Sequence, residues 1–212
     1  MRKTIMVLSL AAVSCTAPVV DQSSINYIQS GFGQLNLVRE GMAILPVIAG
    51  EGQETFRRPM NESIEHYLDT LIPEINYVSW NYSLAQISEN DLTGEYAAAI
   101  ASFKETAIVP KRFLQTCSEL MGVRYLLFLG SGEFGTSEST EYNPLVGIYK
   151  RRKGSIYLIG QIWDAETGSV VWEAVGAGEA SSASKLKKMP AFYKYVDAAA
   201  KGLIEQLRST RL

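Results

Sequence analysis

The sequence is poor in the side chains that most often carry chemistry. Its 212 residues include one histidine, His66, and two cysteines, Cys15 and Cys117. A metal cluster or a serine–histidine nucleophile would have to be built around His66, which lies between Glu65 and Tyr67 on an expected amphipathic helix. Neither G-x-S-x-G nor H-E-x-x-H occurs in the chain. The sequence therefore predicts no catalytic residue, no metal ligand and no cofactor.

Charge and composition argue against a nucleic-acid-binding protein and against a disordered chain. Twenty Lys and Arg residues oppose 22 Asp and Glu residues, and the formal net charge is −2. Nothing in this balance draws the chain onto nucleic acid. Apolar residues make up 47% of the chain and charged residues 20%, which is typical of a folded globule and not of a disordered chain.

An apolar stretch opens the chain. Arg2 and Lys3 precede an apolar run over residues 5–13, which is far shorter than the roughly 20 residues needed to cross a hydrocarbon core. Positive residues followed by a short apolar run are the pattern of a secretory signal. Small residues fill positions 12–14, and Cys15 comes directly after them. An ordinary signal would not require this cysteine.

The A-V-S-C segment at residues 12–15 resembles the lipobox of bacterial lipoproteins, in which cleavage falls just before a lipid-bearing cysteine. The resemblance implies a lipoprotein signal peptide over 1–14 and a lipid anchor at Cys15. Its thiol would carry diacylglycerol, and its freed amine could carry a further chain such as palmitate. Thr16 in place of Asp implies delivery to the outer membrane, facing the periplasm. A plain secretory signal, or a cytosolic protein with an apolar N-terminus, is the alternative.

The number of cysteines is consistent with a lipid anchor at Cys15. If Cys15 is acylated, Cys117 has no partner, so the mature chain is expected to hold no disulfide. Cys117 shares one face of an expected helix with Phe113 and Leu114. This placement predicts a buried, inert thiol.

Hydrophobic periodicity predicts one folded domain after a polar segment. Residues 15–40 are expected to form the lipidated N-terminus and a tether that ends at most in a short strand, and residues 41–212 the domain. Expected strands cover 41–50, 74–80, 123–130, 155–163 and 169–180, and expected helices cover 60–72, 83–106 with a break near Gly94, 110–121 and 190–207. This order predicts an α/β fold, a single domain with a mixed β-sheet and helices packed on it.

G-S-G-E-F-G at residues 130–135 matches the dinucleotide-binding pattern G-x-G-x-x-G. In that pattern a helix must open directly after the glycines to receive the pyrophosphate. The residues that follow lack a helical apolar stripe, and Glu133 and Glu138 would repel phosphate. The segment is therefore interpreted as a glycine-rich exit from a strand into a polar loop over 131–153.

Four consecutive cations lie in Y-K-R-R-K-G at residues 149–154. They are expected to occupy a solvated hairpin loop opposite the acidic stretch 133–141. Contact with anionic lipid headgroups or with a polyanionic cell-wall polymer is the alternative.

The segment Q-I-W-D-A-E-T-G-S-V-V-W-E-A-V-G-A-G-E-A at 161–180 predicts a hairpin with Gly168 in a left-handed conformation. It resembles the closing hairpin of a group of bacterial envelope lipoproteins: the curli secretion-channel family and the penicillin-binding-protein activator lipoproteins. These share a fold like the N-terminal domain of the Tol-system translocation protein. Segments 41–47 and 117–134 and the C-terminal helix support the resemblance. Channel members thread amphipathic hairpins through the membrane, but 131–153 does not alternate, so no pore is expected.

The address and the resemblance imply a lipid-anchored periplasmic protein that acts as a non-catalytic binding or assembly adaptor for another envelope protein. Membrane lipid, bound through the acylated Cys15, and an envelope protein are the expected partners. One alternative is a ring-forming homo-oligomer within an outer-membrane secretion or assembly system. Another is a secreted enzyme whose site is assembled from dispersed carboxylates.

Overall fold

The computed structural model describes residues 23–145, 147–183 and 191–210. Its strands are β1 (Ser24–Ile28), β2 (Met42–Ile44), β3 (Tyr77–Val78), β4 (Tyr125–Ser131), β5 (Gly135–Asn143), β6 (Gly147–Asp164) and β7 (Ser169–Ala183). Its helices are α1 (Gln34–Glu40), α2 (Arg57–Leu71), α3 (Trp80–Glu89), α4 (Thr93–Thr106), α5 (Lys111–Met121) and α6 (Phe192–Ser209), with a 3₁₀ turn at Glu54–Phe56.

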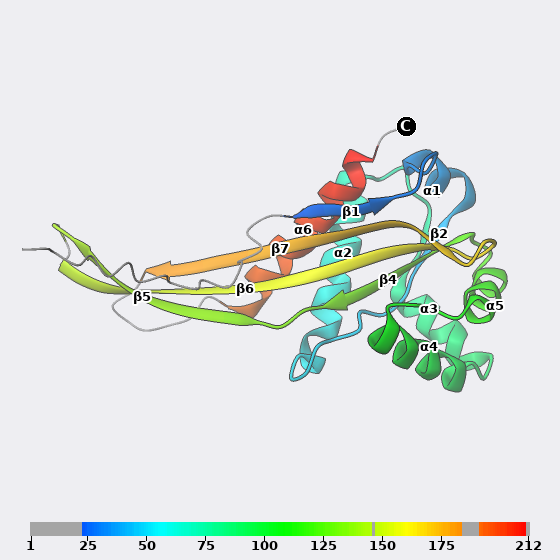
Figure 1. The fold of residues 1–212 in the computed structure, drawn as a ribbon, viewed down its shortest axis with the longest axis horizontal. Coiled ribbons are helices and arrows are strands. Elements are labelled where there is room, and N and C mark those ends of the chain that lie inside the picture. The colour runs from blue at the N-terminus through cyan, green and yellow to red at the C-terminus, as the bar shows by residue number, and fades with distance from the viewer. Residues whose placement is uncertain (1–22, 146, 184–190, 211–212) are drawn as a thin grey trace, which may run out of the picture.

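The strands form one mixed sheet in the order β1-β7-β6-β4-β2-β3, and β5 also pairs with β6 (Figure 1). β2 is parallel to β3 and β4, whereas β6 runs antiparallel to β4, β5 and β7. Helices cover the sheet on both faces, so the predicted single-domain α/β fold with a mixed sheet is confirmed.

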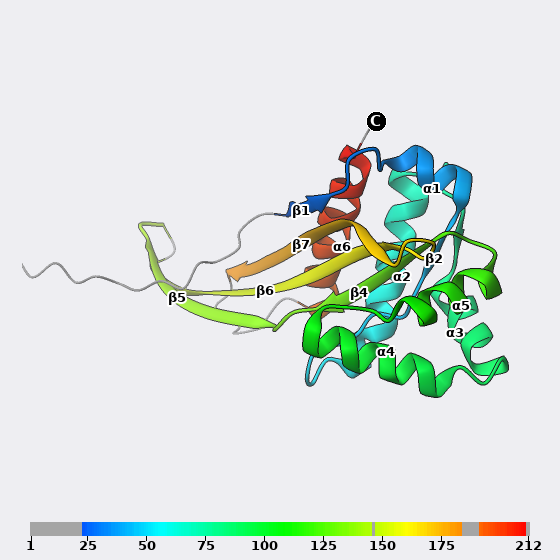
Figure 2. The same ribbon diagram turned by 45° about the vertical axis from the view of Figure 1, so that its right-hand side comes forward.

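Strand β4 shows how the core divides between the two faces. Leu127 and Leu129 belong to the cluster formed with α2 and α6, whereas Leu126 and Phe128 belong to the cluster formed with α4 and α5. All four side chains are buried, because successive residues of a strand point to opposite faces and both faces are covered (Figure 2). The near-continuous apolar run at 123–130 is therefore explained.

The helices follow the predicted apolar stripes. Met60, Ile64 and Leu68 of α2 are fully buried, and the helical pattern at 83–106 divides into α3 and α4. α5 ends at Gly122, whose φ of 66° is left-handed and favours glycine.

The folded body starts earlier in the chain than predicted. Residues 15–40 were expected to be a tether, but β1 is an edge strand paired with β7, and Leu37 of α1 is fully buried. A five-residue strand and a seven-residue helix carry too few apolar repeats to be recognised from periodicity, and their partners lie far along the chain. Cys15 and the predicted signal peptide at 1–14 lie outside the described residues.

The prediction of a polar loop over 131–153 is wrong, because most of this segment forms β5 and the first half of β6. Glu138 accepts from Arg152 at 2.8 Å and also pairs with Lys150, and Arg151 pairs with Glu141 at 3.2 Å. Opposite charges on neighbouring strands thus support this hairpin in place of apolar alternation. The prediction that these cations lie opposite the acidic stretch is confirmed.

Strands β5, β6 and β7 extend past most of the domain as a long arm, whose base lies against α6 (Figure 1). We define the arm as residues 135–157 with residues 176–183. Its tip is the turn between β5 and β6, where Gly147 has a left-handed φ of 77°. The hairpin predicted at 155–180 is confirmed and forms the base of this arm, with Gly168 at φ 74° in its turn.

The thiol of Cys117 is buried in the cluster between the sheet and α5, as predicted. Burial raises its pKa to about 12, so it is protonated at neutral pH and unreactive. It is the one free cysteine within the described ranges. Separately, none of the helices described here is long and apolar enough to span a membrane.

Candidate functional site at the base of the arm

The glycine-rich segment 130–135 breaks one line of strand into two. β4 and β5 lie end to end along the same side of β6, with Ser131 opposite Leu158 and Gly135 opposite Ser155. The backbone N–H of Gly132 donates to Tyr157 O at 2.9 Å, so pairing is barely interrupted. A strand, and not a helix, follows the glycines. The geometry is therefore that of an irregularity within a sheet edge and not of a phosphate-binding turn.

This break turns Phe134 toward helix α6. Its ring centroid lies 5.2 Å from that of Phe192 and 5.2 Å from that of Tyr195. Phe56, which precedes α2, stacks on Phe192 with centroids 3.9 Å apart. The three phenylalanines are partly exposed and form an aromatic wall on the α6 side of the sheet.

The loop at residues 48–53 forms the opposite wall and is fixed to the sheet. The backbone N–H of Ser131 donates to Ile48 O at 3.1 Å, and that of Gly50 donates to Ser131 Oγ at 2.8 Å. The Gln53 amide Nε2 donates to Gly132 O at 2.8 Å. These bonds hold the loop rigidly beside the break between β4 and β5.

A hollow of about 810 Å³ lies between this loop and the aromatic wall. We call it the aromatic hollow; its walls include Gln53, Phe56, Phe134 and Phe192. Gln53 is only 5% exposed, and its Oε1 has no hydrogen-bond partner among the described residues. A buried acceptor without a donor costs about 1–3 kcal/mol, and this oxygen has almost no accessible surface, so the cost falls on the fold and does not mark a ligand contact.

A second hollow of about 580 Å³ lies on the other side of the loop, beside Phe103 of α4. Two of the polar side chains that line it, Gln161 and Glu173, are already hydrogen-bonded. Trp163 Nε1 donates to Gln161 Oε1 at 3.2 Å, and Gln161 Nε2 donates to Glu173 Oε2 at 2.6 Å. Asn26 Nδ2 donates to the other carboxylate oxygen of Glu173 at 3.0 Å. Both oxygens of this carboxylate are therefore engaged within the sheet, which disfavours a role for Glu173 as a general base.

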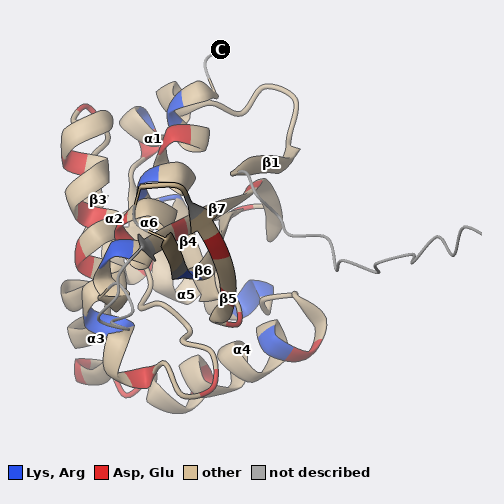
Figure 3. Cartoon of the chain, turned by 90° about the vertical axis from the view of Figure 1, so that its left-hand side faces the viewer, with Lys and Arg blue, Asp and Glu red and all other residues tan. Residues whose placement is uncertain are grey.

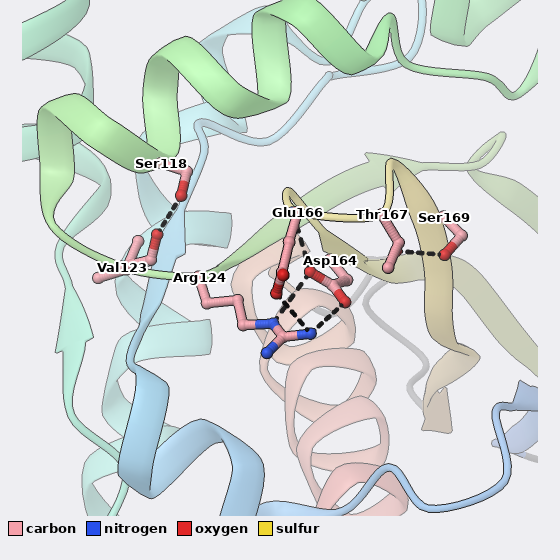
Figure 4. Close-up of polar contacts among 7 residues, drawn as sticks. All are labelled: Ser118, Val123, Arg124, Asp164, Glu166, Thr167 and Ser169. Atoms are coloured by element: carbon pink, nitrogen blue, oxygen red, sulfur yellow. Dashed lines mark hydrogen bonds and ion pairs between the residues drawn. The ribbon is translucent and has the colours of Figure 1, made fainter.

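The end of the sheet opposite the arm carries a charged cluster (Figure 4). Arg124, at the start of β4, donates to both carboxylate oxygens of Asp164 at 3.1 and 2.8 Å, and it pairs with the exposed Glu166 at 3.1 Å. Nearby, Ser118 Oγ donates to Val123 O. The contacts of Arg124 join the beginning of β4 to the turn between β6 and β7, and the bond from Ser118 lies at the end of α5.

The Arg124–Asp164 pair sets the protonation of both groups. Burial alone would raise the pKa of Asp164, but the hydrogen bonds from Arg124 and from the Glu166 backbone N–H outweigh it and hold that pKa below its ordinary value of 3.8. The hydrogen bond to Asp164 likewise raises the pKa of Arg124. The pair is therefore ionised throughout the physiological range and stabilises the fold.

We expect Asp164→Asn to lower the free energy of unfolding at neutral pH by about 2 kcal/mol, because it removes a two-point charged hydrogen bond. Since folding lowers the pKa of Asp164, this stabilisation is present above the ordinary Asp value and is lost as pH falls below it. Urea unfolding measured at pH 7 and in acid should show that the difference in unfolding free energy between the variant and the wild type becomes smaller in acid. Glu166→Gln is the control, because Glu166 is 72% exposed and should contribute well under about 1 kcal/mol. A difference that does not change with pH would contradict this account.

The other residues singled out in the sequence do not gather into a site. His66 lies exposed on α2, and its ring contacts that of Tyr67 at 5.0 Å between centroids. No group of three His, Cys, Asp or Glu residues within the described ranges could hold a metal ion. In the view of Figure 3, acidic and basic positions are interspersed over the helices.

Sequence reasoning missed the aromatic hollow. In the sequence, Phe134 lies within the glycine-rich segment 130–135 and Phe192 near the start of the expected helix 190–207, and nothing local connects the two. The available signal was a large aromatic residue inside an otherwise polar, glycine-flanked segment. Such a residue is expected to pack against another element, but the chain alone does not say which one.

A comparison with protein-family models found no match, and a sequence comparison with curated proteins found none either. Among solved structures, the PelC dodecamer from Paraburkholderia phytofirmans is similar with a TM-score of 0.48 at 9% identity, over 90% of this chain and 100% of that chain. Lipoprotein GNA1162 from Neisseria meningitidis gives a TM-score of 0.40 at 12% identity, over 78% and 96% of the two chains. The LpoB C-terminal domain from Salmonella enterica gives 0.36 at 12% identity, over 68% and 94%. Likenesses at this level concern the fold and assign neither a partner nor an activity.

Proposed function

We propose that the chain is a lipid-anchored envelope protein, facing the periplasm from the outer membrane, that binds another envelope protein and performs no catalysis itself. The anchor would be acylated Cys15, followed by Thr16 in place of the Asp associated with inner-membrane retention. The resemblance to the lipobox supports the proposed localisation, and the geometry of the domain supports the proposed binding role.

The observation that carries the binding role is the aromatic hollow, with three partly exposed phenylalanines along one wall. Aromatic side chains that are already packed lose little conformational entropy on binding, and they are enriched among the residues that dominate protein interfaces. The rigid loop at 48–53 means that the hollow is preformed, which lowers the cost of binding. A partner segment that brings an apolar side chain would match it.

Site-specific photo-crosslinking in membranes tests this proposal. A photoreactive residue replacing the exposed Glu133, at the rim of the hollow, should give one discrete adduct with an envelope protein identified by mass spectrometry. The same residue replacing Glu119, exposed on α5 and away from the hollow, is the matched control. Phe56→Ala in the Glu133-labelled protein should reduce the adduct at least tenfold, as expected for a residue central to an interface. Equal adducts from both positions, or none from position 133, would refute the proposal.

A ring-forming component is the second candidate, and one observation favours it. Along the arm, β5 and the stretch of β7 from Gly178 to Ala183 each pair with β6 on one side only among the described residues. Unpaired strand edges can add a strand from another copy. The native mass of the detergent-extracted protein decides between them, because a strict monomer would rule out a ring.

A further inference from the structure

The tip of the arm carries the most exposed large apolar side chains of the described residues. Leu145 is 94% exposed, Tyr142 is 73% exposed and Ile148 is 72% exposed, and the next largest value, for Tyr193, is 60%. Tyr142 and Ile148 are directly opposite each other on β5 and β6, and Leu145 lies in the turn that joins the two strands. The three side chains therefore gather on one small convex end.

The strands below this tip are polar and charged. Segment 135–155 carries four cations against two carboxylates, and Glu179 of β7 pairs with Lys153 at 2.6 Å. Lys150, two residues below Ile148, pairs with Glu138. An apolar tip above a band of Lys and Arg is the arrangement that suits a lipid interface, because apolar groups enter the acyl region while long cations remain with the headgroups.

The chain enters the domain from the side to which the arm points. β1 runs antiparallel to β7, and the Ala177 backbone N–H donates to Ser23 Oγ at 3.0 Å. Ala177 is opposite Tyr157 of β6, and Ile148 lies nine residues farther along that strand, which is about 30 Å at the usual strand rise. Ser23 lies eight positions after Cys15, and a fully extended chain over eight positions spans at most about 26–29 Å.

We infer that the tip of the arm is a second membrane contact: Tyr142, Leu145 and Ile148 enter the surface of the bilayer that holds the acylated Cys15. The greatest length that the chain from Cys15 to Ser23 can span is close to the length of the arm beyond Ala177, so the anchor and the tip can reach nearly the same plane. The arm then acts as a strut that holds the body, with the aromatic hollow, away from the lipid. This inference rests on the anchor proposed above.

The convex shape of the tip and the length of the tether favour a bilayer over a protein pocket as the occupant. The charge of the arm adds little, because three carboxylates oppose its four cations. Apolar burial therefore supplies most of the contact, and one small tip cannot hold the protein alone. The acyl chains retain the protein and the tip orients it.

Fluorescence quenching in reconstituted vesicles tests the contact. The acylated protein with Leu145→Cys is labelled with an environment-sensitive dye and placed in vesicles of phosphatidylethanolamine and phosphatidylglycerol that contain a spin-labelled lipid. The new thiol is the one that reacts, because Cys15 carries the lipid and Cys117 is fully buried. Ser137→Cys is the matched control, since it lies exposed on the same hairpin opposite Lys153, about 17 Å below the tip.

We expect a blue shift of the dye at position 145 on reconstitution and several-fold stronger quenching there than at position 137. Protein that floats with the vesicles but shows equal, weak quenching at both positions would overturn the tip contact and leave the anchor intact. A blue shift without quenching by lipid would show that protein covers the tip, which also overturns it. Failure of the wild-type protein to float with vesicles would overturn the anchor and the tip contact together.

Discussion

Replacing Gly178 by alanine is expected to destabilise the domain by at least about 3 kcal/mol, the upper end of what overpacking a core usually costs. A Cβ atom at this position of β7 would lie 1.9 Å from the carbonyl oxygen of Tyr195 and 2.7 Å from the amide nitrogen of Ala199, both in α6. At Gly176 the corresponding Cβ would lie 2.1 Å from Ala199 O. These neighbours are backbone atoms and cannot rotate away. The helix would have to lift from the sheet, which would expose Leu203 and Leu207 of the core.

Urea denaturation followed by circular dichroism measures this effect. Gly94→Ala is the matched control, because its Cβ would meet no described atom within 4 Å outside its own helix. Alanine in a helix is favoured over glycine by up to about 1 kcal/mol, so that variant should be as stable as the wild type or more stable. An unfolding free energy for Gly178→Ala within about 0.5 kcal/mol of the wild-type value would show that α6 does not lie against β7 as described.

Gly176 and Gly178 show what local sequence can and cannot predict. The G-A-G-E-A segment was recognised as part of a strand, and the stripe of α6 predicted a helix buried on one face. Neither pattern indicates that the helix lies on those glycines. Their purpose is visible only once β7 and α6 are brought together, because the requirement for a missing Cβ comes from a neighbour that is distant in sequence.

The elements predicted best are those with a strong local signal. α2 and α5 each carry an apolar stripe and end beside a proline or a glycine, and the turn at Gly168 has the residues that such a turn requires. The strands of the arm have no such local sequence signal. Its strands are held by partners across the hairpin, such as Glu138 with Arg152, and a pattern of charges does not distinguish a paired strand from a solvated loop.

The candidate site was harder to predict than the fold for the same reason. Gln53, Phe134 and Phe192 come from a loop, a break in a strand line and the start of the last helix, and they meet only through the topology of the sheet. An unpaired buried acceptor such as Gln53 Oε1 has no sequence signature at all. The predicted envelope localisation rests on residues 1–15, which lie outside the described residues.

Cys15→Ala is expected to move the protein from the membrane fraction to the soluble fraction, or to leave it uncut with residues 1–14 attached. Without the thiol there is no site for diacylglycerol, and one acyl chain binds only marginally where two hold a protein stably. Intact mass of the wild-type protein should show the loss of residues 1–14 and the gain of two or three acyl chains. The same measurement on the variant should show neither acylation nor a cut before position 15.

Cys117→Ala is the control, since it removes the other cysteine of the chain. Cys117 is fully buried within the domain and points to no lipid, so this variant should remain acylated and membrane-bound. Because most apolar side chains of the described domain are buried against its own sheet, the acylated Cys15 is expected to be its main attachment to a bilayer. Wild-type protein recovered from the cytosol with residues 1–14 intact would therefore remove the anchor, and with it the basis for an envelope partner.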